Sequence, residues 1–322
     1  MGKIMNTKLL ILIVSFILIS NFAFADSVYL KSGREIDGWI LEITDEYVKI
    51  DAGGIPLVFF FDTIDGINVE EYSPYITKLV MTEEGKQFSS VYEVSMWITY
   101  YYLNPDSKRL LPALEVALRN RTLWEPEQRA NPIIHFFATA FREDKEEIDK
   151  LRTLLNESDY FQRTILNKII YEAVNPKDIK ADGAESFDLL WAEFFATGKS
   201  EPVLKLIKSL NWRVGYDDLL KFGDLSVLVW SLSANAEQHS RVKRICEQEL
   251  KKRWWGLVRK RLYQALNTPS GELYARYTFE TIIRAERLRN KSEYKNIFGR
   301  IKGFFTNIRD REKFDERIFQ YY

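Results

Sequence analysis

The chain has 322 residues, of which 46 are Lys or Arg and 46 are Asp or Glu. Its single cysteine, Cys246, excludes an intramolecular disulfide, so the fold must be held together by its hydrophobic core. The two histidines, His135 and His239, exclude a His-rich metal site and an HExxH motif. The zero net charge hides an asymmetry, because residues 26–239 carry 23 basic and 36 acidic side chains whereas residues 240–322 carry 21 and 10. The basic C-terminal region would suit an acidic partner, an anionic lipid surface or the acidic body of the same chain.

The N-terminus has the charged, apolar and small-residue order of a secretory signal peptide. Lys3 and Lys8 precede a predominantly apolar run over residues 9–19, and Ala23 and Ala25 stand at the −3 and −1 positions of a cleavage site. The apolar run is short for a membrane span, although an uncleaved anchor is the alternative. We therefore expect the first 25 residues to be a signal peptide that is cleaved after Ala25, and the exported chain to be periplasmic or secreted.

Residues 26–72 predict a small β domain. Five short strands fit within this stretch, with turn signals at Gly33, at Thr44–Asp45 and at Gly53–Gly54. Apolar residues alternate along these strands, as expected for one buried face. So many short strands in so few residues favour a strongly bent small barrel. A barrel of this size is marginally stable alone, so we expect it to dock on the helical body or on a second copy.

The order of Val28–Arg34, Gly38 and the two hydrophobic strands that follow resembles the first half of an Sm-like barrel. The segment Asp62–Ile67 resembles the short helical turn and last strand of SH3-like barrels. The resemblance implies an Sm-like or SH3-like fold. The asparagine of the Sm family's uridine pocket, expected near Tyr47 and Val48, is absent. RNA binding is therefore not carried over, and no nucleic-acid partner is expected.

From residue 74 onward the apolar period changes from 2 to 3.6, and Pro, Gly, Asn and Asp breaks separate short helical segments, with one stop-and-start corner at Gly198–Ser200. Many short helices with tight links predict an α-solenoid or a compact helical array over residues 74–268. The sequence thus predicts a multi-domain α+β protein, in which an SH3/Sm-like β-barrel precedes an all-α, solenoid-like array and a basic amphipathic helical segment over 269–322. The predicted helical segments are Val91–Leu103, Asp106–Arg119, Pro126–Phe141, Lys145–Asn156, Tyr160–Val174, Glu185–Thr197, Glu201–Leu210, Asp224–Gln238 and Ser240–Leu266.

A second resemblance covers most of residues 100–250. It depends on Asp188–Gly198, on the Trp230–Val242 stretch that follows it, and on Tyr101–Pro105 in the first half. These residues look like a family of uncharacterised bacterial exported or lipid-anchored helical proteins. The resemblance implies an all-helical envelope protein and brings with it no activity and no site.

The segment Ser240–Leu266 is expected to be one long basic helix, with nine basic residues around a single apolar face. Residues 297–308 repeat the pattern, with apolar side chains at helical spacing among basic ones. Amphipathic basic helices that carry Trp can lie on anionic membranes. The alternative is an ordinary solvated face whose apolar stripe packs on the helical body.

The sequence contains no GxSxG, Walker or GxGxxG motif, and no cofactor or metal is expected. His135 lies in an apolar segment and is interpreted as a core histidine, and Cys246 is interpreted as a buried, inert thiol. His239 stands between two predicted helices. It fits the capping of the second helix together with Ser240, or, less simply, a role as base or ligand.

We therefore expect a non-catalytic interaction or scaffold protein of the bacterial cell envelope, whose concave helical surface binds another envelope protein. A peripheral membrane protein that uses its basic C-terminus is the alternative. A third candidate is an envelope hydrolase that uses Glu237 with His239, or Glu193. The sequence gives no prediction of the oligomeric state. The candidate interaction residues are Trp191, Glu193, Trp230, Asn235, Glu237, His239, Trp254 and Trp255.

Overall fold

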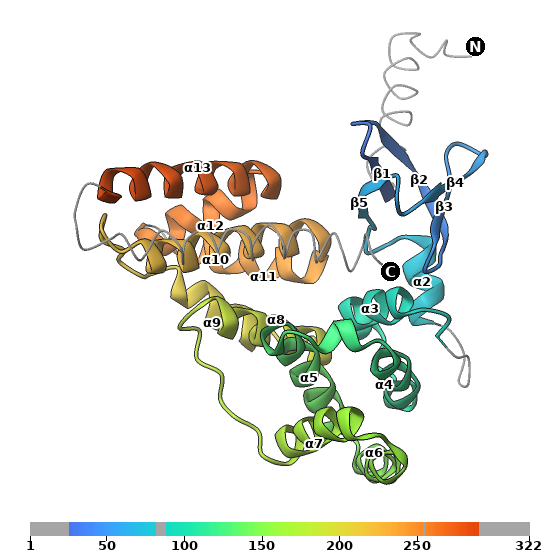
Figure 1. Cartoon of the computed structure of the whole chain (residues 1–322). Helices are drawn as coiled ribbons and strands as arrows, with labels where there is room; N and C mark the ends of the chain where they lie inside the picture. The colour runs from blue at the N-terminus through green and yellow to red at the C-terminus, as the bar shows by residue number, and fades with distance from the viewer. Residues whose placement is uncertain (1–25, 82–87, 254, 290–322) are drawn as a thin grey trace, which may run out of the picture.

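The computed structural model describes residues 26–81, 88–253 and 255–289. A five-stranded antiparallel sheet comes first, and within the described residues twelve α-helices, labelled α2 to α13, follow it (Figure 1). The predicted α+β order is confirmed. The predicted signal peptide, Trp254 and the segment 290–322 with its apolar repeat lie outside the described residues.

The strands are arranged in the order β4-β3-β2-β1-β5, so that β4 and β5 are the two edges among the described strands. The longest strand, β2, pairs with β1 through its first half and with β3 through its second half, and a bulge interrupts the second ladder between Ile40 and Glu42. A bulge bends the strand that carries it, which helps to curve the sheet around one apolar face. The strands are β1 (Asp26–Leu30), β2 (Glu35–Ile43), β3 (Tyr47–Asp51), β4 (Pro56–Phe60) and β5 (Ile64–Asn68).

The centre of the sheet's inner face is buried. Ile40 of β2 lies opposite Ile50 of β3, and both side chains point into the core because alternate residues of a strand share a face. Gly38 lets β2 approach β3 closely, since a Cβ atom at this position would overlap the carbonyl oxygen of Asp51. The absence of a side chain at residue 38 is therefore a packing requirement.

The carboxylate of Asp26 fixes the sheet to the first helix. It is buried and accepts hydrogen bonds from the backbone N–H of Ile40 at 2.8 Å, the backbone N–H of Glu70 at 2.9 Å and the hydroxyl of Ser73 at 2.7 Å. Ser73 is in turn the N-cap of α2 and accepts from the N–H of Tyr75. One side chain therefore joins β1, β2 and the start of α2, and its burial raises its pKa.

The helices form two successive groups. The first group consists of α2 (Pro74–Val80), α3 (Val91–Tyr100), α4 (Leu110–Arg119), α5 (Glu127–Arg142), α6 (Lys145–Glu157) and α7 (Tyr160–Val174), with 3₁₀ turns η1 (Tyr101–Leu103), η2 (Ser107–Arg109) and η3 (Arg121–Trp124). The second group consists of α8 (Ala184–Thr197), α9 (Glu201–Ser209), α10 (Leu219–Gln238), α11 (Ser240–Lys251), α12 (Leu257–Asn267) and α13 (Ser270–Arg289). The expected corner at residues 198–200 is confirmed, because Gly198 ends α8 in the left-handed conformation with φ of 62°.

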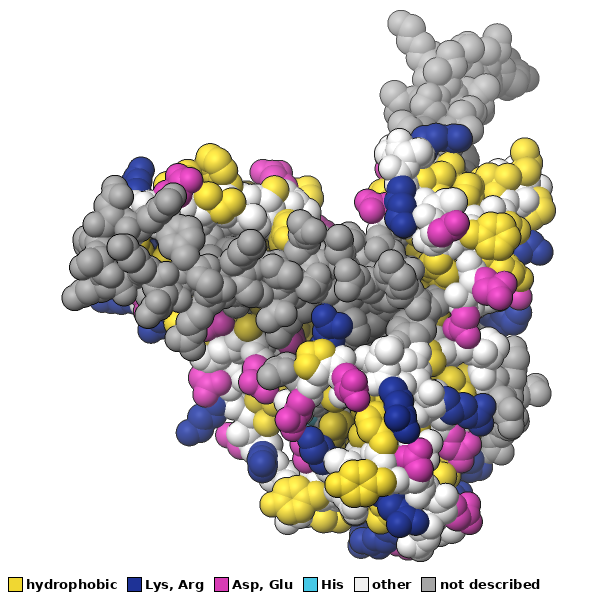
Figure 2. All heavy atoms as spheres, viewed as in Figure 1, with side chains coloured by type: hydrophobic (Ala, Val, Ile, Leu, Met, Phe, Trp, Pro, Cys, Tyr) yellow, Lys and Arg dark blue, Asp and Glu magenta, His cyan; other side chains and the backbone are white. Residues whose placement is uncertain are grey.

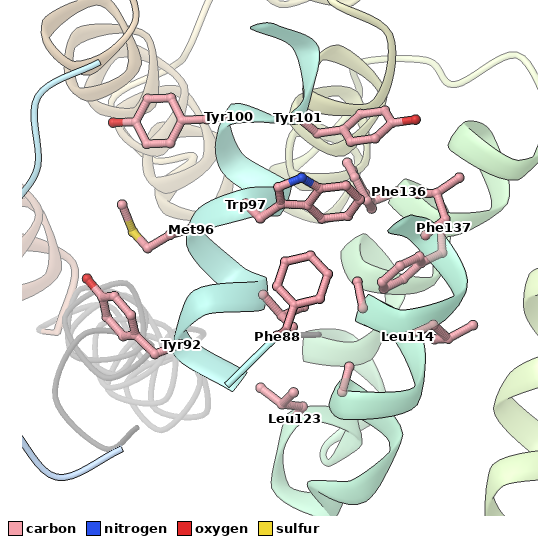
Figure 3. Packing of buried hydrophobic residues seen from close by; sticks show 14 of the residues in the cluster. Phe88, Tyr92, Met96, Trp97, Tyr100, Tyr101, Leu114, Leu123, Phe136 and Phe137 are labelled. Carbon is pink, nitrogen blue, oxygen red and sulfur yellow. The ribbon is translucent and has the colours of Figure 1, made fainter. Parts of the chain in front are cut away.

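The buried apolar side chains form two clusters. The first runs without interruption from the inner face of the sheet through α7, and Figure 3 shows its aromatic centre. There the ring of Trp97 lies 5.2 Å from that of Phe88 and 4.9 Å from that of Tyr101, both edge-on. The second cluster is formed mainly by α8 to α13. The sheet therefore shares its core with the first helices, and the expected docking of the small β domain on the helical body is confirmed.

The predicted long basic helix over Ser240–Leu266 is wrong, because the structure contains two helices there, α11 and α12. Gly256 separates them with φ of 103°, a conformation that side-chain-bearing residues rarely adopt. The guanidinium of Arg259 donates to the carbonyls of Leu250 and Arg253 at 3.0 and 2.7 Å, which ties the start of α12 to the end of α11. Most apolar positions of both segments face the core, although Leu257 is exposed, so the helical spacing of apolar residues continues across the turn.

We expect Gly38→Ala to lower the free energy of unfolding by about 1–3 kcal/mol, the usual cost of forcing extra atoms into a packed site. Urea unfolding followed by circular dichroism measures this change. Gly215→Ala is the matched control, because a Cβ atom at residue 215 meets no atom within 4 Å and the residue does not have a positive φ. Equal stability of the two variants would contradict the close approach of β2 and β3.

Candidate functional site

The structure does not bring the eight candidate interaction residues together on one surface. Trp191 and His239 are buried, whereas Glu193, Trp230 and Asn235 are partly buried. Glu237 is exposed, and its carboxylate accepts hydrogen bonds from the N–H and hydroxyl of Ser270, which begins α13. Trp255 is 88% exposed, and Trp254 lies outside the described residues. The positions of these residues range from the hydrophobic core to the solvent-exposed surface.

His239 occupies an aromatic cage at the junction between α10 and α11. Its ring centroid lies 5.1 Å from that of Tyr100 and 5.2 Å from that of Phe195, and the rings of Tyr102 and Phe194 complete the cage. The side chain has no exposed surface. The burial of His239 could not be predicted from its position between two helices. The rings around it come from α3, η1 and α8, which are far from it in the sequence.

A chain of hydrogen bonds leads from this cage to the β domain. The Tyr102 hydroxyl donates to the Glu71 carboxylate at 2.7 Å and lies 3.1 Å from Nδ1 of His239. The second oxygen of Glu71 accepts from the backbone N–H of Ser240 at 2.6 Å. Glu71 therefore caps α11 with a negative charge at the positive end of the helix. The expected capping by the His239 side chain is wrong, since His239 is the N-cap residue of α11 but its side chain makes no capping hydrogen bond.

The charge states of this junction follow from its burial. Burial lowers the pKa of His239 to about 3, so the imidazole is neutral near pH 7. Burial and then the hydrogen bond to Glu71 raise the pKa of Tyr102. Because the Tyr102 hydroxyl donates its hydrogen bond to Glu71, Nδ1–H of His239 donates to the tyrosine oxygen. Nε2 of His239 then carries a lone pair inside the cage. A general base must reach its substrate, and an imidazole with no exposed surface offers no such contact.

The outer face of the sheet has the opposite character, because it exposes large apolar side chains. We define this face by Tyr29, Trp39, Tyr47, Val58 and Phe60. The ladders place Tyr47 directly opposite Phe60, with ring centroids 6.3 Å apart, and Lys49 opposite Val58. Trp39 is 38% exposed, Val58 48% and Phe60 55%. Figure 2 shows hydrophobic side chains gathered over the strands, at the upper right of the view.

Sequence reasoning missed this face, although a signal was present. An ordinary half-buried strand alternates apolar and polar residues. The β4 strand instead reads Pro-Leu-Val-Phe-Phe over residues 56–60, so it is apolar on both faces. Leu57 and Phe59 pack against the core, which leaves Val58 and Phe60 for the outer face. A small sheet is covered by helices on one side only. A strand such as β4, which is apolar on both faces, therefore indicates an exposed apolar surface.

An open groove of about 470 Å³ lies where α10 begins. Its carboxylates have structural partners: Asp218 accepts from the N–H of Lys221 at 3.1 Å and Asp224 accepts from the N–H of Ala184 at 3.3 Å. Both thus cap helix N-termini. Within the described ranges there is no group of three or more His, Cys, Asp or Glu side chains that could hold a metal ion. Two of the three carboxylates that line the groove therefore act as helix caps, and the third belongs to Asp182.

The predicted core roles of His135 and Cys246 agree with their positions. His135 is 6% exposed, and its Nδ1 lies 3.2 Å from the Glu172 carboxylate. Cys246 is fully buried, and burial raises the pKa of its thiol to about 12, so the reactive thiolate is suppressed near pH 7.

Comparison with known proteins gives no match to a protein family, a curated protein or a solved structure. Among the helices that the structure describes, none combines the length and apolar character needed to cross a membrane.

We expect the free energy of unfolding to fall as the pH decreases from 6.5 towards 3, because the unfolded chain binds a proton at His239 that the folded chain excludes. In this window the contribution of His239 approaches about 1.4 kcal/mol for each pH unit. Urea unfolding of the natural chain and of His239→Phe at several pH values measures it. The variant should lose less stability, because phenylalanine fills the cage without titrating.

The comparison between the two proteins cancels other titrating groups. Asp26, whose pKa is raised in the folded state, acts in the opposite direction and is present in both. The hydroxyls of Tyr100 and Tyr102 stay protonated throughout the window, and Glu71 is common to both proteins. Identical pH dependence of the natural chain and the variant would contradict a neutral, buried His239.

Proposed function

We propose that this protein is an exported, non-catalytic interaction or scaffold protein of the bacterial cell envelope, and that the outer face of its sheet binds a partner protein. The exposed apolar side chains of Trp39, Val58 and Phe60 are the observation that carries this proposal. Large apolar side chains gathered on one exposed face often mark a surface that meets a partner. We therefore place the proposed partner site on the sheet. The sequence had suggested the helical surface, but its candidates Trp191 and His239 are buried.

The edge strand strengthens the argument for a protein partner. On one side β4 pairs with β3, and on its other side the described strands provide no neighbour. Residues 55–61 of this edge carry no charge. Charged or proline-interrupted edges are the usual protection against strand addition, and β4 has only a proline at its first position. A partner segment could therefore pair with the edge while its side chains contact Val58 and Phe60.

We also propose an Sm-like or SH3-like barrel, a solenoid-like helical array and export from the cytoplasm. The strand order and the bent β2 suit the Sm-like or SH3-like barrel expected from the sequence, and the paired helices suit a solenoid-like array. Export follows from the signal-peptide order of residues 1–25. The first strand begins at Asp26, so removal of those residues would leave every described strand intact.

A photoreactive benzoylphenylalanine placed at Phe60 in the full-length chain should form a covalent adduct with one protein in illuminated intact cells. The reason is that a partner on the outer face lies within reach of the Phe60 side chain. Gel analysis and mass spectrometry of the purified adduct identify the partner. Adding Val58→Lys to the same chain should abolish the adduct, because the charge disrupts an apolar contact.

The matched control carries the photoreactive residue at Tyr171, which is 58% exposed, close to the 55% of Phe60, but lies on α7. Adducts of equal yield at both positions would indicate non-specific collision and contradict the proposed partner surface. So would the absence of any adduct at Phe60.

The exported protein should begin at Asp26. Intact-mass measurement of protein recovered from the periplasm or the medium should give the mass of residues 26–322. Ala25→Tyr should block cleavage, because the −1 position requires a small residue. Recovery of the uncleaved natural chain at the membrane would instead support the anchor alternative.

A further inference from the structure

The turn between α11 and α12 exposes an aromatic side chain to an unusual degree. Trp255 is 88% exposed, and the neighbouring Leu257, the first residue of α12, is 37% exposed. A tryptophan normally buries most of its large apolar surface or finds a partner for its indole N–H. The exposed ring of Trp255 is therefore available for a contact with another molecule.

Described residues on both sides of Trp254 make contacts that flank the turn. Gly256 has φ of 103°, and Arg259 donates two hydrogen bonds to carbonyls on the α11 side of the turn. On the same side, the buried Glu249 forms ion pairs with Lys252 at 2.7 Å and with Arg253 at 3.2 Å. Trp255 therefore stands next to a glycine of positive φ, between the two packed helices α11 and α12.

The surroundings of Trp255 are strongly basic. Residues 251–263 contain six Lys and Arg side chains and no acidic one. Arg259 closes the turn, and Arg261 donates to carbonyls at the end of α9. Lys251, Lys252 and Lys260 are exposed on the two helices beside the turn. A solvent-facing tryptophan is thus accompanied by three exposed lysines, of which Lys252 is paired with Glu249.

The position of the turn separates it from the sheet. The helix α11 begins at Ser240, whose N–H is bound by Glu71 next to the β domain. Twelve helical residues, about 18 Å in length, carry the chain from there to the turn. Figure 1 shows α10 to α13 to one side of the strands, and the turn lies at the end of α11 that is away from Ser240. A contact at the turn leaves the outer face of the sheet free.

We propose that the α11–α12 turn, defined as Lys251, Lys252, Trp255, Leu257 and Lys260, docks on the surface of an anionic lipid bilayer. Tryptophan favours the interface between headgroups and acyl chains, where its apolar ring and polar N–H are both accommodated. Lysines beside it are attracted to anionic headgroups. The combination of a protruding indole, an adjacent leucine and surrounding positive charge fits a lipid surface better than a polyanion, which would leave Leu257 without a contact. This role differs from one carried by the segment 290–322 and does not require the proposed role of the sheet.

Co-sedimentation with vesicles tests the proposal on the full mature chain. Vesicles of mixed phosphatidylglycerol and phosphatidylcholine should bind the natural chain, and binding should weaken as salt is raised. Pure phosphatidylcholine vesicles should bind it much less. Removing one lysine should lower the partition coefficient about fivefold, so Lys251→Gln combined with Lys260→Gln should lower it by roughly 25-fold. Trp255→Ala should lower it by about tenfold, since it removes the inserted ring.

Tyr160→Ala is the matched control, because Tyr160 is also 88% exposed but stands at the start of α7. It should bind vesicles like the natural chain. Thermal unfolding should show that all variants keep the natural stability, since the replaced side chains are exposed. Failure of the natural chain to bind anionic vesicles would overturn the proposal. Undiminished binding by the Trp255 and lysine variants would also overturn it and assign the lipid contact to another part of the chain.

Failure of this proposal and failure of the sheet proposal are separate results. The vesicle assay contains no protein partner, so it reports only on the lipid contact. The photoreactive residue at Phe60 reports on a protein within reach of β4, at the other end of α11. A chain with benzoylphenylalanine at Phe60 and the Lys251→Gln and Lys260→Gln changes should therefore still form the adduct.

Discussion

The buried carboxylate of Glu71 is the interaction on which the arrangement of the whole chain depends. It lies just after the sheet and accepts a hydrogen bond from the hydroxyl of Tyr102 in the first helical group. It also caps α11 of the second group by accepting a hydrogen bond from the N–H of Ser240. A buried charge is costly unless its hydrogen bonds are complete, and breaking such a set typically destabilises a protein by several kcal/mol. The three parts are therefore held in one relative position, and a movement of any one of them would leave a buried polar group without its partner.

The Glu71 contact lies at the boundary where the two hydrophobic clusters meet. The first cluster runs from the sheet through α7, and the second occupies α8 to α13. Tyr102 belongs to the second cluster, while the adjacent Tyr101 belongs to the first. Two consecutive tyrosines thus face different cores. Gly198 permits the close contact at this boundary, since a Cβ atom there would lie 3.2 Å from Cβ of Tyr102 in addition to requiring a positive φ. Aromatic packing and the hydrogen bonds of Glu71 meet at the same boundary.

Local patterns predicted the elements well, whereas contacts between distant residues were not predictable. Strand alternation gave the five strands, and the Gly198 corner separated α8 from α9, because both signals lie within a few neighbouring residues. Gly256 was overlooked because the apolar stripe continues across the turn, so periodicity alone predicts one helix. Glu71 and Ser240 are 169 residues apart, and no local rule links them. The same limit applies to His239, whose burial depends on rings from α3, η1 and α8.

The rigid junction gives the two proposed surfaces a fixed relation. The outer face of the sheet and the α11–α12 turn lie on opposite sides of the Glu71 contact, and α11 extends from that contact to the turn. If the turn docks on an anionic bilayer, the sheet is held away from the membrane and its apolar edge remains accessible to a protein. A flexible linker would lose this orientation and would pay the entropy of ordering at each binding event. A neutral, buried His239 and the hydrogen bonds of Glu71 avoid that loss, because they hold the two proposed surfaces in one orientation.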